Sequence, residues 1–371
     1  MLGKAKWIGS LLLMQLLLGS SLAAAELPAS LQGLGLREAA QPSRELPGWR
    51  KPTRVLVRQL FGQDNSKALQ QLAPGVEIVA VSSAAEAAEK IATAQVLIGF
   101  CEQDIFDRAE QLHWVQVYFA GVENCVSLPA MRSGKLVLTN GQRLGSPTLA
   151  DHSIALMMAL TRGLSANFAS QQAGQWQPNW SAMPPAIGEV QGRTLLVVGL
   201  GGIGSQVARR AHGMGMRVIA TRGSRREGPD YVEYVGLSHE ALELARRADV
   251  VVNAAPLTDS TRGMFNAEFF AAMKSTAYFI SVGRGQSTVT ADLVKALNSG
   301  QIAGAGLDVV DPEPLPPGHE LWSTPGVIIT PHVGGRSREA FQRIGALVAE
   351  NLRRYVAGEP LLSVVDIKRG Y

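Results

Sequence analysis

The chain has 371 residues, which corresponds to about two domains. It carries 35 Lys and Arg against 31 Asp and Glu, a surplus of four positive charges. So small a surplus excludes a nucleic-acid-binding protein held mainly by phosphate neutralisation. Because 46% of the residues are hydrophobic and only 18% are charged, most of the chain is not disordered and a large core is possible.

The N-terminal residues, 1–25, have the pattern of a secretory signal peptide. Two lysines precede an apolar stretch, and Ala23 and Ala25 occupy the −3 and −1 positions of a cleavage site before Glu26. We therefore expect a periplasmic or secreted protein. An uncleaved membrane anchor is one alternative, because the uncharged stretch is long enough to span a bilayer. A misassigned start codon is another. In the last case the protein would be cytoplasmic.

Residues 26–51 contain several prolines and are expected to form a polar linker or arm. From residue 53 onward, short apolar strands alternate with helical patterns, which is typical of a parallel-sheet α/β protein. In the first series the expected strands are 54–58, 76–81, 95–100, 114–118 and 135–139, with a helix at 84–93.

A long helical pattern, 148–172, separates this series from a second one. The strands expected there are 194–198, 217–220, 250–253, 278–282, 305–309 and 327–330, and a final helix covers 337–356. Two series of this kind predict two doubly wound parallel-sheet lobes with a cleft between them.

The second series opens with an apolar strand that leads into a glycine-rich loop and then a helical pattern. The loop reads Gly199-Leu200-Gly201-Gly202-Ile203-Gly204. Gly199 permits the tight turn, Gly201 lets backbone N–H groups approach a pyrophosphate, and Gly204 lets helix and strand pack closely. The sequence therefore predicts a dinucleotide site, although an ordinary strand–turn–helix glycine cluster is the alternative.

An arginine follows the next strand, where an NAD-specific site would place a carboxylate. A carboxylate would repel a 2′-phosphate, whereas guanidinium groups pair with it. We therefore expect NADP(H), bound by Arg222 with help from Ser224 or Arg225. NAD(H) stays possible, because this loop could be an ordinary solvated basic segment.

Three later segments place Arg284, Glu313 and His332 just after expected strands, where open α/β sheets bind ligands. These residue types suit the reduction of a 2-oxoacid. Histidine can protonate the alkoxide that forms when a hydride adds to the carbonyl, and a carboxylate can fix its tautomer. A guanidinium can bind the substrate carboxylate and polarise the carbonyl. Singly, each residue could instead be structural.

With these motifs, and with the segments 253–258, 307–309 and 330–332, the chain resembles the D-isomer-specific 2-hydroxyacid dehydrogenase family from residue 54 to the C-terminus. The resemblance implies a catalytic triad of Arg284, Glu313 and His332. It also implies cofactor contacts beyond the glycine loop and Arg222, namely Pro256, Thr258, Val282, Gly283, Asp308, Gly334 and Gly335. The turn Ala120-Gly121-Val122 would hold the substrate carboxylate through backbone N–H groups, unless it is a plain strand-ending turn.

The resemblance further implies a flavodoxin-like substrate domain of residues 52–147 plus 336–371, with a Rossmann cofactor domain, 148–335, inserted into it. It also implies a homodimer. The favoured activity is an NADPH-dependent reductase of small 2-oxoacids such as glyoxylate or hydroxypyruvate. A dehydrogenase of larger D-2-hydroxyacids using NAD, and a non-catalytic dinucleotide sensor, are the alternatives. No nucleic acid or metal is expected, and a membrane only if the leader is uncleaved.

The two cysteines, Cys101 and Cys125, are too few for a disulfide framework or a cysteine-based zinc site. We expect both to be free residues of the core. A disulfide between them would nevertheless suit an exported protein.

Overall fold

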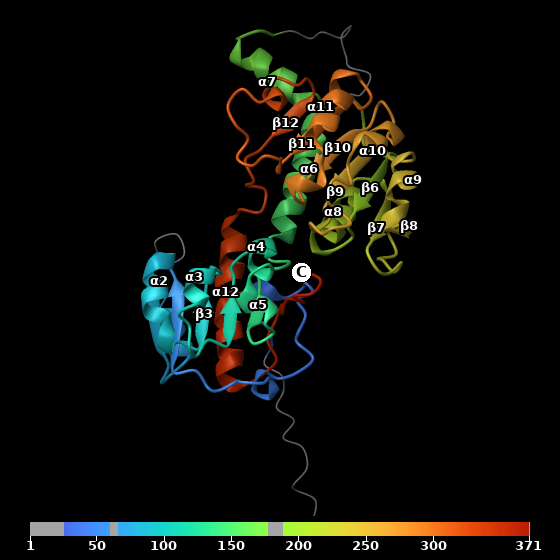
Figure 1. Cartoon of the computed structure of the whole chain (residues 1–371). Coiled ribbons are helices and arrows are strands. Elements are labelled where there is room, and N and C mark those ends of the chain that lie inside the picture. The colour runs from blue at the N-terminus through green and yellow to red at the C-terminus, as the bar shows by residue number, and fades with distance from the viewer. Residues whose placement is uncertain (1–25, 60–65, 177–187, 371) are drawn as a thin grey trace, which may run out of the picture.

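The computed structural model describes residues 26–59, 66–176 and 188–370, and its strands form two parallel sheets in two lobes (Figure 1). The expected signal peptide, 1–25, lies outside the described residues. Among the helices that the structure describes, none is long and apolar enough to cross a membrane. The α/β prediction with two parallel-sheet lobes is confirmed.

The first lobe is built on a five-stranded sheet of order β2-β1-β3-β4-β5, with every pairing parallel. Its strands are β1 (Arg54–Arg58), β2 (Glu77–Val81), β3 (Val96–Ile98), β4 (Trp114–Gln116) and β5 (Val137–Thr139). All five expected strands are present within a few residues of their predicted bounds. The central strands are buried on both faces, which explains their continuous apolar sequence.

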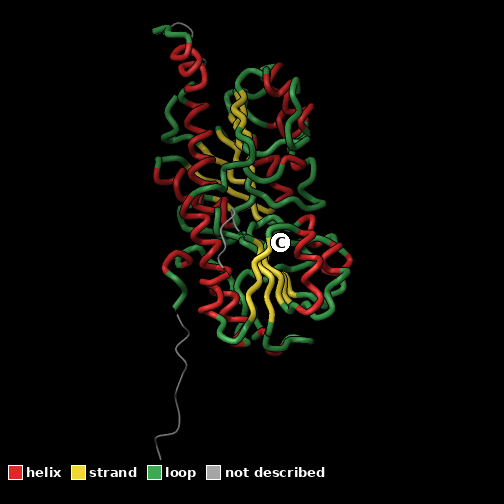
Figure 2. The backbone as a smooth tube through the Cα atoms, turned by 90° about the vertical axis from the view of Figure 1, so that its left-hand side faces the viewer, coloured by secondary structure: helices red, strands yellow, loops and turns green. Residues whose placement is uncertain are grey.

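Helices flank this sheet on both sides (Figure 2). They are α1 (Ser66–Leu72), α2 (Ala84–Lys90), α3 (Gln103–Phe106), α4 (Glu123–Val126), α5 (Pro129–Arg132) and the C-terminal α12 (Arg338–Ala357). The Ser337 side chain caps α12 at its start, and Gly358 ends it in the left-handed conformation at φ 72°. The Tyr355 ring of α12 stacks on the Trp114 ring of β4, with the two ring centroids 5.0 Å apart. The last helix therefore belongs to the first lobe.

The segment 26–51, expected as a polar linker or arm, is an arm packed on the first lobe. Leu31 is fully buried, and Leu34, Leu36 and Trp49 pack against the same core as α12. A bridge between Glu38 and Leu362 adds backbone hydrogen bonding. The alternating leucines explain why this proline-containing segment is not a free linker.

The second lobe has a seven-stranded parallel sheet of order β12-β11-β10-β9-β6-β7-β8. Its strands are β6 (Thr194–Val198), β7 (Arg217–Arg222), β8 (Tyr234–Leu237), β9 (Val250–Asn253), β10 (Tyr278–Ser281), β11 (Gly304–Leu307) and β12 (Val327–Ile329). The strand β8 was not expected from the sequence. It is a short edge strand whose Gly236 weakens the local strand signal.

The helices of the second lobe are α6 (Ser146–Thr161), α7 (Leu164–Gln172), α8 (Gly202–Gly213), α9 (Ala241–Ala245), α10 (Ala267–Ala272) and α11 (Thr290–Asn298). The single helix expected over 148–172 is two helices, because Gly163 adopts a left-handed φ of 62° between them. Whereas α6 packs on the lobe, α7 extends beyond it at the top of Figure 1.

The expectation that Cys101 and Cys125 are free was wrong, since they form a disulfide with their Cα atoms 5.6 Å apart. The bond joins the segment after β3 to α4. Sequence spacing could not show this, because the fold brings the two residues together by placing β3 beside β4.

Loss of the disulfide is expected to destabilise the first lobe. The bond spans 24 positions of sequence, and a loop of that size contributes about 3 kcal/mol by restricting the unfolded chain. Denaturant unfolding of Cys125→Ser should show a free energy of unfolding lower by this amount. The double variant Cys101→Ser/Cys125→Ser should show no further decrease. Reducing agent should lower the midpoint of the unmodified protein only. Equal midpoints for all of them in the absence of reductant would contradict the expectation.

Candidate active site

Residues expected to contact the substrate or the cofactor lie at one edge of the seven-stranded sheet. Arg284 follows β10, Asp308 follows β11 and His332 follows β12, and these three strands are neighbours in the sheet. Their parallel register aligns Ser281 with Leu307 and Leu307 with Ile329. The strands therefore deliver these side chains to their common carboxyl edge.

His332 and Glu313 are in direct contact, with the imidazole Nδ1 2.6 Å from the carboxylate Oε1. Both side chains are part-exposed, at 47% and 39%, so water or a ligand can reach them. The contact fixes the ring and makes Nδ1 the nitrogen that carries a hydrogen toward Glu313. No hydrogen bond to Nε2 occurs within the described part of the chain, so that atom is available for proton exchange.

The turn that carries His332 is held by the buried carboxylate of Asp308. Its Oδ1 accepts hydrogen bonds from the Thr330 hydroxyl at 2.7 Å, Val333 N–H at 3.0 Å and Gly334 N–H at 3.1 Å. The backbone of His332 is left-handed at φ 53°, and its N–H donates to the Asp308 carbonyl at 2.9 Å. The resemblance places Asp308 beside the cofactor; in the structure its carboxylate also fixes the histidine turn.

Asp308 has a second partner that the sequence did not suggest, His152 of α6. Its Nε2 lies 2.8 Å from the Thr330 hydroxyl and 3.4 Å from Asp308 Oδ1. Burial alone would raise the pKa of Asp308, but hydrogen bonds from His152, Thr330, Gly334 and Val333 outweigh it and lower that pKa below its usual range. His152 lies far from this turn in sequence and no local motif marks it.

Arg284 reaches across to the first lobe. Its Nε donates to Glu123 Oε1 at 2.9 Å and its Nη1 to the Gly283 carbonyl at 2.8 Å. Nη2 lies directly against Gly121, where any Cβ would collide with it. The sequence did not point to Glu123, the first residue of α4.

The predicted substrate turn therefore lies against the predicted guanidinium. Asn140 Nδ2 donates to the Ala120 carbonyl at 2.8 Å and holds the turn in place. Within the described residues, the N–H groups of Gly121 and Val122 donate to no protein acceptor. Arg284 with the turn forms one group and His332 with Glu313 another; no hydrogen bond in the described part of the chain joins the two.

The glycine loop between β6 and α8 has the shape that a dinucleotide phosphate requires. Gly199 has φ 95°, and a Cβ there would lie 2.8 Å from the Ala255 backbone. A Cβ at Gly204 would collide with the Gly199 carbonyl, whereas one at Gly201 would meet nothing within 4 Å. The loop is thus tightly packed on one side and open at Gly201, beside the first N–H groups of α8, and it fits a pyrophosphate.

Arg222 ends β7, and no carboxylate pairs with it among the described residues. Its Nε is buried without a hydrogen-bond partner. Burial lowers the pKa of this guanidinium, and the charges of Arg225, Arg143 and Arg37 lower it further, while Glu227 acts in the opposite direction. Ser224 and Arg225 follow on an exposed loop. A buried guanidinium nitrogen without a protein partner fits an anion site.

The remaining expected cofactor contacts surround the carboxyl ends of β9 and β10. Buried Asn253, at the end of β9, connects these two strand ends: its Nδ2 donates to the hydroxyls of Ser281 at 3.1 Å and Ser287 at 2.8 Å. The expected residues near these ends or in the turn after His332 are Pro256, Thr258, Val282, Gly283, Gly334 and Gly335.

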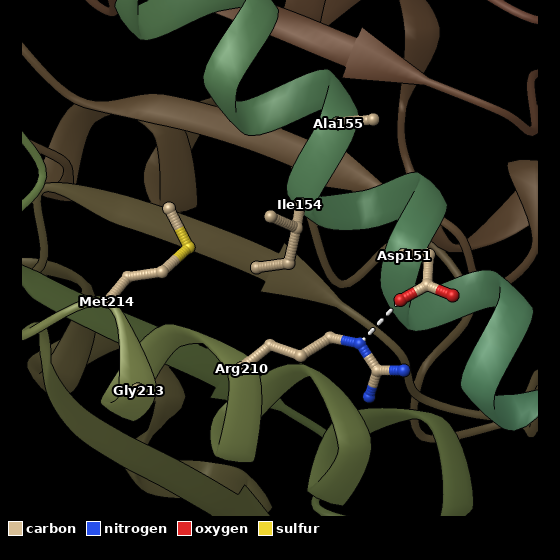
Figure 3. Close-up of a pocket in the computed structure, with 6 residues that line it drawn as sticks. All are labelled: Asp151, Ile154, Ala155, Arg210, Gly213 and Met214. Carbon is tan, nitrogen blue, oxygen red and sulfur yellow. Dashed lines mark hydrogen bonds and ion pairs between the residues drawn. The ribbon is translucent and has the colours of Figure 1, made fainter.

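A hollow of about 520 Å³ lies away from these residues, between α6 and α8, and is lined by residues such as Ile154 and Met214 (Figure 3).

The chain matches the family model described as "D-isomer specific 2-hydroxyacid dehydrogenase, NAD binding domain" over residues 154–334. It is 37% identical to a glyoxylate reductase of Korarchaeum cryptofilum over 259 residues, covering 70% of this chain and 77% of that protein. A glyoxylate reductase of Pyrococcus furiosus is also 37% identical, over 264 residues, with the same coverage of 70% and 77%.

Solved structures agree with these sequence matches. An NADPH-dependent glyoxylate/hydroxypyruvate reductase of Sinorhizobium meliloti, in complex with NADP and sulfate, superposes with a TM-score of 0.72 at 28% identity, covering 86% of this chain and 100% of that one. A D-isomer specific 2-hydroxyacid dehydrogenase of Xanthobacter autotrophicus, in complex with NADPH and MES, gives 0.73 at 28% identity over 85% and 99%. The chain therefore belongs to the D-isomer-specific 2-hydroxyacid dehydrogenase family, a family of NAD(P)-dependent enzymes.

Proposed function

We propose that the protein reduces a small 2-oxoacid of the glyoxylate or hydroxypyruvate type to the 2-hydroxyacid, with NADPH as the hydride donor. The observation that carries this proposal is the 2.6 Å contact between His332 and Glu313 at the strand edge that also bears Arg284. The similarity to proteins named glyoxylate reductase supports the small substrate.

In this proposal the bound cofactor supplies a hydride to the carbonyl carbon, and the protein handles the charges and the proton. His332 donates a proton from Nε2 to the alkoxide oxygen, while Glu313 holds Nδ1 and stabilises the imidazolium form. Arg284 binds the substrate carboxylate through its terminal nitrogens while Glu123 keeps hold of Nε. The N–H groups of Gly121 and Val122 complete the carboxylate site.

The glycine loop and the carboxyl ends of β9 and β10 would hold the cofactor itself. The N–H groups of Gly202 and Ile203, just after the open Gly201, would bind the pyrophosphate, while Gly199, Gly201 and Gly204 shape the loop. In the reverse direction, the same imidazole would accept the proton of a D-2-hydroxyacid.

Replacement of His332 by Gln should reduce turnover by roughly 10²–10⁴-fold, because the proton donor is lost. Glu313→Gln should act in the same direction, since the neutral amide no longer fixes and stabilises the imidazolium. The measurement is NADPH oxidation, followed by its near-ultraviolet absorbance, against a panel of 2-oxoacids. NADPH binding, measured by fluorescence, is the control and should stay unchanged. Turnover equal to that of the unmodified protein would remove His332 from this role.

The same panel separates the alternatives. Larger 2-oxoacids reduced faster with NADH would favour a dehydrogenase of larger D-2-hydroxyacids. Cofactor binding with no turnover on any 2-oxoacid would favour a dinucleotide sensor, a protein that has no need for a coupled His332 and Glu313.

For the cofactor we propose a preference for NADP(H). The absence of a paired carboxylate on Arg222 within the described residues and its buried, unpartnered Nε support this preference. The relatives solved with NADP or NADPH also support it.

Arg222→Ala should weaken NADPH binding by about ten- to a hundred-fold, the effect of losing a hydrogen bond to a charged group, and should leave NADH binding nearly unchanged. Dissociation constants for both cofactors give the measurement. Arg247→Ala, which removes an exposed arginine of the same lobe, is the matched control. An equal loss for NADH and NADPH would contradict the proposal, as would NADH binding as tightly as NADPH in the unmodified protein.

We propose that the protein is a homodimer formed through the second lobe. Exposed apolar side chains support this: Phe168 on α7 is 57% exposed and Trp176 just beyond it is 94% exposed. A hollow between α6 and α8, lined by Ile154 and Met214 beside the Asp151–Arg210 ion pair, lies on the same lobe (Figure 3).

Phe168→Ser/Trp176→Ser should shift the molar mass measured by light scattering from that of a dimer toward that of a monomer. Trp322→Ser, which removes another exposed indole, at 55%, is the control and should leave the mass unchanged. A monomeric unmodified protein at micromolar concentration would rule out the dimer.

We also propose that the protein is exported to an oxidising compartment. The charge and apolar pattern of the leader supports export, and the Cys101–Cys125 disulfide supports oxidising surroundings. Sequencing the N-terminus of the native protein, with Glu26 expected first, distinguishes a cleaved leader from an anchor.

A further inference from the structure

Four arginines from three separate segments of the chain gather beside the end of β7. Arg222 and Arg225 follow that strand, Arg143 lies in the turn before α6, and Arg37 belongs to the N-terminal arm. The charges of Arg37 and Arg225 lower the pKa of Arg143, after the larger effect of its burial. All three of these neighbours likewise act on Arg222, so the four guanidinium groups lie within electrostatic reach of one another.

Arg143 connects the arm to the glycine loop. Its Nη1 donates to the Leu34 carbonyl at 3.3 Å and would lie 2.9 Å from a Cβ at Gly35. Its Cγ would lie 3.0 Å from a Cβ at Gly202, the first residue of α8. The side chain therefore spans from the first lobe to the start of the proposed phosphate-binding helix.

The backbone of Arg143 is left-handed at φ 71°. A non-glycine residue rarely adopts this conformation, which is strained. Strained residues of this kind concentrate at functional sites, and Arg143 lies against the first residue of α8.

The cluster has no compensating ion pair among the described residues. None of the four arginines lies within ion-pair distance of a carboxylate, whereas Arg210, Arg217, Arg226, Arg353 and Arg354 all do. Glu227 influences Arg222 only from beyond that distance. Like charges held together in this way repel one another, and an anion of more than one charge would relieve the repulsion.

We propose that Arg37 and Arg143 complete, from the first lobe, the binding site for the 2′-phosphate of NADP(H) that Arg222 and Arg225 begin in the second lobe. This inference rests on the proposed NADP(H) preference. The 2′-phosphate is favoured over the pyrophosphate because the cluster centres on the residues after β7, the place of the adenosine ribose. The pyrophosphate has its own site at the N–H groups after Gly201.

A phosphate held in this way bridges the two lobes. Arg222 and Arg225 bind it from the second lobe, and Arg143 with the arm residue Arg37 from the first. The arm, packed on the first lobe through its leucines, then acts as a cofactor-binding element and not only as a structural one.

The test compares Arg143→Gln, Arg37→Gln and the double variant with the unmodified protein. Dissociation constants are measured by calorimetry for NADPH, NADH, 2′,5′-ADP and 5′-AMP. Each single variant should bind NADPH and 2′,5′-ADP about ten-fold more weakly, as expected for a lost charge-assisted contact, and the double variant more weakly still. NADH and 5′-AMP should bind within about two-fold of the unmodified protein. Retained NADH binding also shows that the variants are folded.

Arg44→Gln, which changes an exposed arginine elsewhere on the arm, is the matched control and should alter none of the four constants. Unchanged NADPH binding in the double variant would overturn the inference, and so would an equal loss for NADPH and NADH, which would assign the arginines to the pyrophosphate.

The result can be told apart from failure of the proposed function. If the unmodified protein reduces no 2-oxoacid but Arg143→Gln still loses 2′,5′-ADP affinity, the proposed reaction fails and the arginine site stands. If the unmodified protein reduces glyoxylate with a clear NADPH preference and the double variant keeps it, the reaction stands and the arginine site fails.

Discussion

The carboxylate of Asp308 lies buried at the end of β11 and accepts hydrogen bonds from the turn that follows β12. A buried charge is stable only when such donors surround it. The turn is consequently fixed, and with it the left-handed backbone of His332. The position of the imidazole relative to Glu313 depends on this arrangement. His332 lies within the turn that Asp308 holds, and Glu313 lies on the loop that follows Asp308.

A second set of contacts connects the lobes at the same edge of the sheet. Arg284 extends from β10 to Glu123 of α4, and His152 of α6 supports the Asp308 turn from the side. The proposed chemistry thus lies where the first lobe, α6 and the second lobe meet.

Much of the fold was readable from the sequence, because buried parallel strands are continuous apolar runs and glycine marks their turns. The runs at β1 and β6 were placed within the observed bounds. The edge strand β8 and the break at Gly163 were missed, since a single glycine in a short or helical pattern is a weak local signal.

Some residues of the candidate site were likewise predictable from the sequence, and others were not. Arg284, Glu313 and His332 were found because each follows a recognisable strand, whereas Glu123, His152 and Arg143 were not. Each of these three makes its contact with a residue more than a hundred positions away or in the other lobe, so only the folded chain brings the partners together. The Cys101–Cys125 bond was missed for the same reason.

That bond lies close to the site proposed for the substrate carboxylate. Cys125 is two positions after Glu123 and belongs to the same short helix. The covalent link therefore anchors the helix whose first carboxylate orients Arg284. Surrounding thiols that cut the link would release this helix from the segment after β3 and leave the Arg284 guanidinium less firmly oriented. The redox state of the surroundings would then affect the proposed carboxylate site through a single covalent bond.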